Sequence, residues 1–300
     1  MKFSIVGIIF DGSIDNLVVR FLDIFQEIIR ERDQKYITII VLHEYAFTKH
    51  AKEKKEIKLF LEELSNIIKP YNDIILIPGS FAVFKKYPSP PKYNEKISKL
   101  KKNYEELSKE KFMSVDEEFK RESDRLDFDL EDAIFLENST YLITNTIQKK
   151  YKKSLPWGER DKLQTLAHQE NALFNIGSGR NAKNEFLMND MPISLGVTIC
   201  REFYHNAKND EVLGNAPPML HLIISDSIRI DEKDNLYGAL TIHMDSKRKL
   251  SLFLNIAHPE SNKITGAQGI LYSVTKNHYQ KSSVQIKSYD KLITSSPQLK

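Results

Sequence analysis

The chain contains very little cysteine, no long apolar run and almost no excess of charge. Its 300 residues include a single cysteine, Cys200, so an internal disulfide is excluded and a reducing compartment fits the chain. No apolar run is long enough to span a bilayer. With 44 basic and 41 acidic residues the net charge is +3, which gives no electrostatic case for nucleic acid. We therefore expect a soluble, cytoplasmic protein without a nucleic-acid or membrane partner.

The amino-terminal residues 3–10 are apolar and follow Lys2, an order also found at the start of signal peptides. Asp11 and Gly12 end the run, and no small-residue cleavage site follows. A buried first strand is therefore predicted here, and a signal peptide is not.

Hydrophobic spacing predicts alternating strands and helices in the first eighty residues. Strands are expected at 3–10, 36–42 and 74–77, and helices with one apolar stripe at 14–29 and 57–68. This order is typical of an α/β sheet with crossover helices. Further strands are expected at 140–144, 146–152, 195–200, 220–225, 240–244, 250–255 and 268–274. We expect one domain over residues 1–290 and a flexible tail over 291–300.

Residues 86–135 interrupt this order with a charged insert. Apolar positions three and four apart between Ile97 and Leu107 predict an amphipathic helix, and Asp116 to Asp132 is expected to be an acidic loop. Two interpretations stay open for the insert. It is either a solvated surface helix with its loop, or a lid or partner-binding arm.

Two side chains with possible chemistry stand at the ends of apolar strands. Cys200 ends the run Leu195 to Cys200 and is either a nucleophile or a buried structural thiol. Glu44 follows another apolar strand, where a partly buried carboxylate becomes a competent base for a thiol. Strand alternation places His43 on the opposite face from Glu44, so His43 is interpreted as a structural, hydrogen-bonded histidine.

A third candidate, Lys153, lies in a lysine-rich segment that would ordinarily be a solvated face. It precedes the turn Pro156-Trp157-Gly158, and Trp157, the only tryptophan, would make a good pocket wall. A glutamate, a lysine and a cysteine in this chain order supply a base, an oxyanion stabiliser and a nucleophile. Lys153 is also expected to favour the thiolate form of Cys200.

Together these segments resemble the nitrilase superfamily of carbon–nitrogen hydrolases. The resemblance covers roughly residues 3–275 without the insert, and it rests on five segments in the family's order. They are Val41-Leu42-His43-Glu44, Ile77-Pro78-Gly79-Ser80, Asn138 to Ile143, Tyr151-Lys152-Lys153-Ser154-Leu155-Pro156-Trp157, and Gly196-Val197-Thr198-Ile199-Cys200. The resemblance implies a four-layer αββα sandwich that forms homodimers or larger homo-oligomers.

The resemblance also implies roles for single residues. Glu44 matches the general base, Lys153 the catalytic lysine and Cys200 the nucleophile, and Glu159 matches a second glutamate that supports the lysine and substrate. Pro156 to Glu159 and Cys200-Arg201-Glu202 are similar to segments of the apolipoprotein N-acyltransferase branch. That branch has membrane helices, which this chain lacks. A lipid-modifying transferase is therefore not expected. The backbone N–H of Arg201 is expected to hold the oxyanion together with Lys153, and Arg201 and Glu202 are expected to bind or support the substrate.

Departures from the family pattern leave the substrate class open. His43 replaces the usual proline, and Glu202-Phe203-Tyr204 replaces an aspartate and arginine pattern after the cysteine. The expected function is hydrolysis of a small amide through a thioester, without metal or cofactor, and a nitrile stays an alternative substrate.

Two rival functions are also open. One is a catalytically silent binding protein on this fold, which would bind a protein partner through the insert. The other is a metal-dependent phosphoesterase with Glu44, Asp226 and His258 as ligands. Asp226, at the end of the predicted strand 220–225, is expected either to line the pocket or to cap a turn.

Overall fold

The structure is a computed structural model of the chain. It describes residues 1–10, 16–47, 51–86, 90–109, 116–127, 133–153, 172–176, 184–200, 202, 217–230 and 236–290. Trp157, Glu159, Arg201 and the predicted tail 291–300 lie outside these ranges. None of the described helices is long and apolar enough to cross a membrane.

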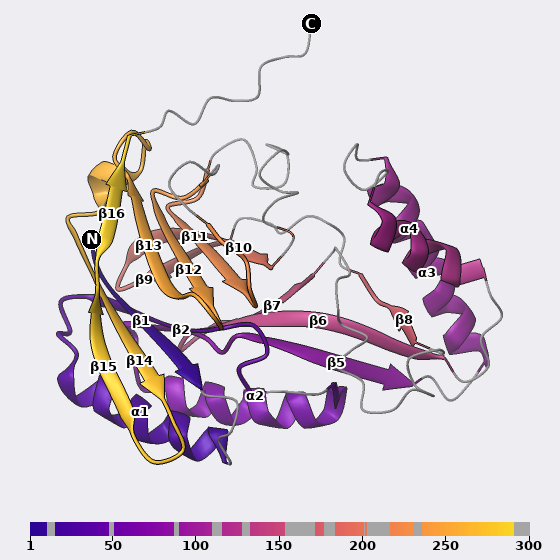
Figure 1. The fold of residues 1–300 in the computed structure, drawn as a ribbon, viewed down its shortest axis with the longest axis horizontal. Helices are drawn as coiled ribbons and strands as arrows, with labels where there is room; N and C mark the ends of the chain where they lie inside the picture. The colour runs from indigo at the N-terminus through magenta and orange to yellow at the C-terminus, as the bar shows by residue number, and fades with distance from the viewer. Residues whose placement is uncertain are drawn as a thin grey trace, which may run out of the picture.

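A sheet of ten strands, called sheet A here, forms one layer of the molecule (Figure 1). Its order is β15-β14-β1-β2-β4-β6-β5-β3, and β7 and β8 also pair with β6. The bounds are β1 Lys2–Phe10, β2 Ile37–Leu42, β3 Lys52–Glu53, β4 Ile74–Ile77, β5 Ser80–Lys86, β6 Ile134–Ile143, β7 Gln148–Lys152, β8 Ala172–Phe174, β14 Gly266–Val274 and β15 Tyr279–Val284.

A sheet of six strands, called sheet B, packs on one face of sheet A (Figure 1). Its order is β16-β13-β12-β11-β10-β9. The bounds are β9 Asn184–Met188, β10 Met191–Ile199, β11 Leu220–Ser225, β12 Leu240–Asp245, β13 Lys249–Asn255 and β16 Ile286–Tyr289. The inner faces of both sheets share one apolar core, in which Ile5 and Ile39 of sheet A meet Leu222 and Ile242 of sheet B.

Two helices cover the other face of sheet A, α1 (Leu17–Glu31) and α2 (Lys54–Ile68) (Figure 1). They form a second core in which Phe25 and Leu64 pack with Ile8 and Ile40, all with 0% exposure. Burying such a side chain stabilises the fold by about 1.5–3 kcal/mol. Strand alternation therefore explains both cores, because Ile5 faces sheet B whereas Ile8 faces the helices.

The parallel pairing of β1 with β2, and of β2 with β4, follows from α1 and α2, which are the crossover connections. Two stacked sheets with helices outside confirm the expected fold class. The expected strands are also present, although β6 begins earlier than expected, at Ile134.

The insert holds two helices, α3 (Pro90–Ser108) and α4 (Glu117–Asp124), followed by a 3-10 turn. Figure 1 shows them at the opposite end of the molecule from β14, β15 and β16. The insert core is a third apolar cluster in which Leu100, Tyr104 and Phe119 pack with Leu136 and Phe174. The hydroxyl of Tyr104 donates to the carbonyl of Phe174 at 3.2 Å, which fixes α3 against β8.

The expectation of an acidic loop from Asp116 to Asp132 is wrong over Glu117–Asp124, which is helical. The carboxylate of Asp116 caps this helix by accepting the N–H of Phe119 at 2.9 Å. Phe119 is 1% exposed in the insert core. Its burial and the cap at Asp116 stabilise a helix here although the segment is highly charged.

Candidate active site

Three strand ends from the two sheets carry the candidate residues. Glu44 lies just beyond β2, in an isolated parallel bridge with Ser80. Lys153 directly follows β7, and its N–H donates to the carbonyl of Asn138 at 2.8 Å. Cys200 directly follows β10, and its N–H donates to the carbonyl of Ile224 at 2.7 Å. Backbone hydrogen bonds to neighbouring strands therefore hold each position.

The structure brings the three side chains together. Nζ of Lys153 lies 3.6 Å from Oε1 of Glu44, and these side chains are 0% and 2% exposed. The Cys200 thiol hydrogen-bonds the Glu44 carboxylate and lies within electrostatic reach of Lys153. A carboxylate, an ammonium group and a thiol thus share one buried position between the sheets.

The thiol is protonated in the resting site. Burial and then the negative charge of Glu44 raise the pKa of Cys200 from 9.0 to about 12, against the lowering effects of Lys153 and the Asp226 backbone. Lys153 favours the thiolate as expected, because its charge lowers the thiol pKa, but burial and Glu44 outweigh it. A nucleophilic role for Cys200 requires a base that removes its proton.

Cys200 has a left-handed backbone, with φ of 53°. Non-glycine residues adopt this conformation at a cost of roughly 1–3 kcal/mol, and such positions cluster at functional sites. Tyr45, directly after Glu44, also has a positive φ of 58°. The chain therefore turns sharply at both the carboxylate and the thiol.

Asn138 on β6 holds the carboxylate in place. Its side-chain Nδ2 donates to Oε1 of Glu44 and to the hydroxyl oxygen of Tyr45, both at 2.8 Å. Asn138 is 0% exposed, and its carbonyl accepts the Lys153 N–H. Sequence reasoning assigned no role to Asn138, because its neighbours Glu137, Ser139 and Thr140 are also polar and no local pattern distinguishes it.

Strand alternation separates Lys153 from the lysines that precede it. Lys150 and Lys152 form ion pairs with Glu137 on the other face of the β6–β7 hairpin, Lys152 at 3.7 Å. Tyr151 faces the core between the sheets, and Lys153 ends up on the same side as Tyr151. The residue chosen from sequence is therefore the one that reaches Glu44.

Glu202 is buried, with 1% exposure, and its Oε2 accepts the N–H of Ile199 at 3.0 Å. It therefore supports the end of the strand that carries Cys200. The other predicted supporting residues, Trp157, Glu159 and Arg201, lie outside the described residues.

Asp226 supports the site through its backbone. A backbone hydrogen bond from Asp226 reaches the Cys200 thiol, whereas its carboxylate accepts from the hydroxyl of Ser246. Asp226 therefore stabilises a turn with its side chain and contacts the thiol with its main chain. The two alternatives from sequence, capping a turn and lining the pocket, thus both apply.

His43 has the structural contact expected of it, because its Nδ1 donates to the backbone carbonyl of Glu44 at 2.8 Å. Burial lowers the pKa of His43, with the charges of Asp226 and Asp245 acting in the opposite direction. A neutral His43 therefore stabilises the turn at Glu44.

Among the described residues, no group of three or more histidine, cysteine, aspartate or glutamate side chains could hold a metal ion. Glu44, Asp226 and His258, the ligands of the phosphoesterase alternative, are all described and do not form such a group.

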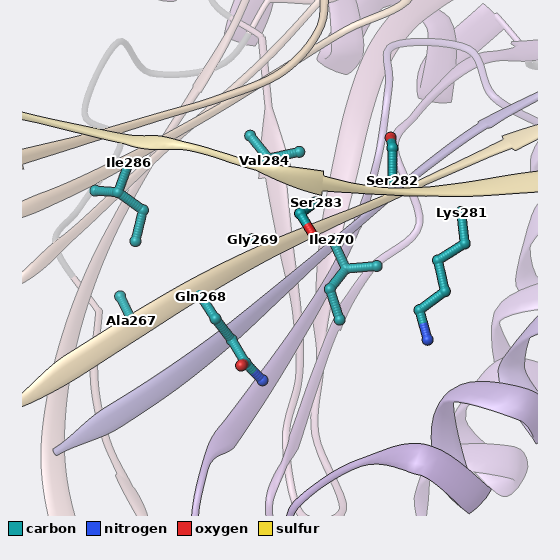
Figure 2. Close-up of a pocket in the computed structure, with 9 residues that line it drawn as sticks. All are labelled: Ala267, Gln268, Gly269, Ile270, Lys281, Ser282, Ser283, Val284 and Ile286. Atoms are coloured by element: carbon teal, nitrogen blue, oxygen red, sulfur yellow. The ribbon is translucent and has the colours of Figure 1, made fainter.

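A cavity of about 700 Å³ lies at another place, between β14, β15 and β16. Figure 2 shows the side chains of Gln268, Ile270 and Lys281 extending to one side of the paired strands β14 and β15. Its lining contains neither a carboxylate nor a thiol, so it is separate from the candidate active site.

No family model matches the sequence, and no curated protein matches it either. Among solved structures, Nit3 of Saccharomyces cerevisiae, a member of branch 10 of the nitrilase superfamily, is similar at 11% identity and a TM-score of 0.35. That likeness covers 77% of this chain and 69% of Nit3. An N-terminal amidase is similar at 12% identity and a TM-score of 0.36, over 76% of this chain and 49% of the amidase.

Nit3 is a member of the superfamily that the sequence motifs resemble. The chain spans about half the length of the N-terminal amidase that it matches. Identities and TM-scores this low carry no argument about activity. The case for a function therefore rests on the contacts of Glu44, Lys153 and Cys200.

Proposed function

We propose that the chain is a thiol-dependent carbon–nitrogen hydrolase that cleaves small amides. The observation that carries this proposal is the convergence of Glu44, Lys153 and Cys200. The carboxylate lies against both the ammonium group and the thiol. A base in contact with the nucleophile, with a cation beside both, is the arrangement that acyl transfer requires.

In the first half of the reaction, Glu44 takes the thiol proton as the Cys200 sulfur attacks the amide carbonyl carbon. Proton transfer accompanies attack, because the thiol pKa of about 12 disfavours a free thiolate. The ammonium group of Lys153 donates to the developing oxyanion, and one such donor typically contributes about 3 kcal/mol. Glu44 then passes its proton to the amine, the C–N bond breaks and a thioester remains on Cys200.

In the second half, Glu44 takes a proton from water and the resulting hydroxide attacks the thioester carbonyl carbon. The C–S bond breaks, the sulfur regains its proton from Glu44, and a carboxylic acid leaves. Lys153 stabilises the same oxyanion position in both halves. Each proton taken by Glu44 is returned, so the site is ready for another cycle.

The burial of the site favours small substrates. Cys200 is 7% exposed, and Glu44 and Lys153 are still less exposed. An acyl group must therefore bring its carbonyl carbon to a nearly enclosed sulfur. Short, unbranched primary amides fit this requirement best.

Intact-mass spectrometry tests the proposal directly. The protein is incubated with a panel of short primary amides and nitriles and quenched in acid. The expected result is a mass gain equal to one acyl group that is removed by hydroxylamine, as a thioester is. Cys200→Ala is the matched control and must show no gain. An adduct that persists in Cys200→Ala contradicts the assignment of the nucleophile.

The raised thiol pKa favours a second candidate function, a catalytically silent protein with an inert buried cysteine. This alternative predicts no acyl adduct with any amide or nitrile from a folded protein. The same panel distinguishes the two functions, because a protein with native circular dichroism and no adduct throughout would support the silent alternative.

A further inference from the structure

Five lysines converge on a cavity at the start of α2 and the end of β5. The cavity, called the lysine pocket here, has a volume of about 440 Å³. Its lining consists of Glu53, Lys54, Lys55, Lys58, Phe84, Lys85 and Lys86. Ligand sites commonly have volumes of about 300–1,000 Å³. The lysine pocket is therefore large enough for a small ligand.

Local topology explains why these lysines meet. The short strand β3 pairs with β5, with Glu53 opposite Phe84, and α2 begins directly after β3. The first turns of α2 therefore lie beside the end of β5, and the lysines of both elements are exposed there. Phe84 is half-buried and supplies an apolar wall between them.

One carboxylate, that of Glu53, lines the lysine pocket beside the five lysines. The Glu53 carboxylate already accepts a backbone N–H in the capping box of α2. Nζ of Lys58 lies 3.6 Å from Oε1 of Glu62, and this ion pair is exposed, so its attraction is weak. No ion pair of Lys54, Lys55 or Lys86 is found among the described residues. Lys54, Lys55 and Lys86 thus bring positive charge to the lysine pocket that no ion pair of the described residues offsets.

The positive charge continues from the lysine pocket toward the β6–β7 hairpin. Burial raises the pKa of Glu137, yet Lys150, Lys152 and Lys54 together hold it below its ordinary value. Burial lowers the pKa of Lys96 on α3, the charge of Glu137 acts in the opposite direction, and neighbouring lysines, including Lys85, lower it further. Concentrated like charge of this kind attracts anions.

The other large cavity provides a contrast. Of the nine residues that line the cavity in Figure 2, Lys281 alone is basic. Five lysines around one cavity are therefore a local feature and do not follow from the overall composition, which is nearly balanced at 44 basic and 41 acidic residues.

We propose that the lysine pocket binds a compact oligophosphate group. Several ammonium groups around one cavity match a ligand with several negative oxygens better than a single carboxylate. The cations of the lining are all lysines, and lysine binds phosphate as a point charge. A free oligophosphate and the phosphate chain of a nucleotide present the same chemistry to the pocket.

This site is separate from the proposed hydrolase. Lys85 pairs across the strands with Phe135, which shares a face of β6 with Glu137, whereas Asn138 lies on the other face with Glu44. The lining of the lysine pocket includes neither Glu44 nor Lys153 nor Cys200. Binding can therefore be tested whether or not the chain hydrolyses amides.

Isothermal titration of the full chain with tripolyphosphate at low salt tests the proposal. We expect saturable binding that weakens with added salt. The double variant Lys54→Gln/Lys85→Gln should weaken it at least about tenfold, because two charge-assisted contacts are removed. The matched control, Lys35→Gln/Lys69→Gln, removes two exposed lysines near the other end of α2, about 20 Å away. This control should bind as the original chain does.

Three outcomes would overturn the proposal. They are no saturable binding by the original chain, equal loss in both double variants, and tighter binding of a single-stranded oligonucleotide that is lost in the pocket variant. Titration with ATP identifies the source of the phosphate. Tighter binding of ATP than of tripolyphosphate supports a nucleotide, and equal or weaker binding supports a free oligophosphate. Circular dichroism of all variants checks that the fold is intact.

Discussion

The two faces of the β6–β7 hairpin carry the same residue types with different consequences. On one face Glu44 and Lys153 are 2% and 0% exposed, beside Asn138 and Cys200. On the other face Glu137 pairs with Lys150 and Lys152, whose side chains are 34% and 22% exposed. A glutamate–lysine pair therefore suggests chemistry only where burial is nearly complete and a third reactive group is in contact.

The largest expected effect is on catalysis by the two glutamates. Glu44→Gln should lower kcat/KM for amide hydrolysis about 10³-fold, because the base that takes the thiol proton is lost. Glu137→Gln should lower it less than about tenfold, since Glu137 touches no reacting group. Steady-state kinetics with the best amide from the mass panel provide the measurement. Equal losses of kcat/KM in the two variants would show that Glu44 has no special catalytic role relative to Glu137.

The next effect is on stability. Lys153→Met should reduce the free energy of unfolding by about 3 kcal/mol, because it leaves the Glu44 carboxylate buried without its cation. Lys150→Met should cost less than about 1 kcal/mol, since its pair with Glu137 is partly exposed. Urea unfolding measures both values. Adding Glu44→Gln to Lys153→Met should restore most of the loss, and failure to do so would show that charge is not the cause.

Alkylation of the thiol should respond with opposite signs to the two charges of the buried face and not at all to the charges of the other face. Glu44→Gln should speed the reaction of Cys200 with iodoacetamide at pH 8 about tenfold, because a negative charge that raises the thiol pKa is removed. Lys153→Met should slow the reaction, because a charge that lowers the pKa is removed. Glu137→Gln and Lys152→Met serve as controls and should leave the rate unchanged. Labelling is followed by intact mass.

The smallest effect concerns Lys152. Burial, together with Lys96 and Lys150, lowers the pKa of Lys152 from 10.5 to about 7, against Glu137. The unfolded chain then binds more protons than the folded chain between about pH 7 and 10.5, so this contribution to stability rises with pH in that window. At pH 7, Lys152→Met should be more stable than the original chain by about 1 kcal/mol, after allowance for solvent screening.

That difference should shrink toward pH 10.5, and urea unfolding at several pH values measures it. Lys149→Met, at an exposed position on the same strand, is the control and should show no such trend. A constant difference across the pH range would show that burial does not set the charge of Lys152.

Much of this arrangement could be predicted from sequence. Periodicity located the strands that end near Glu44, Lys153 and Cys200, because apolar alternation and apolar runs report burial directly. The resemblance then selected Lys153 from a run of lysines that periodicity alone does not resolve. The structure supports that selection by contact with Glu44, and the catalytic roles stay predictions.

Other features depend on contacts that no local pattern contains. Asn138 lies on β6, far from Glu44 in the sequence, so their hydrogen bond follows only from the strand order within sheet A. The left-handed turn at Cys200 occurs without a glycine, so no residue type in the sequence indicates it. The thiol pKa depends on how far burial and the Glu44 charge, which raise it, outweigh the Lys153 charge, which lowers it, and the sequence does not contain this balance. Homo-oligomer formation, a partner for the insert and the cytoplasmic location also stay predictions.

Tyr45 joins the insert to the Glu44 carboxylate. Its ring packs on the insert core, and its hydroxyl oxygen shares the Asn138 amide group with Glu44. A change in how the insert packs on the Tyr45 ring would therefore shift a phenol oxygen that accepts from the same amide group as the carboxylate. The insert and the proposed base consequently have to vary in concert during evolution, and a graft that exchanges one without the other would misalign the carboxylate.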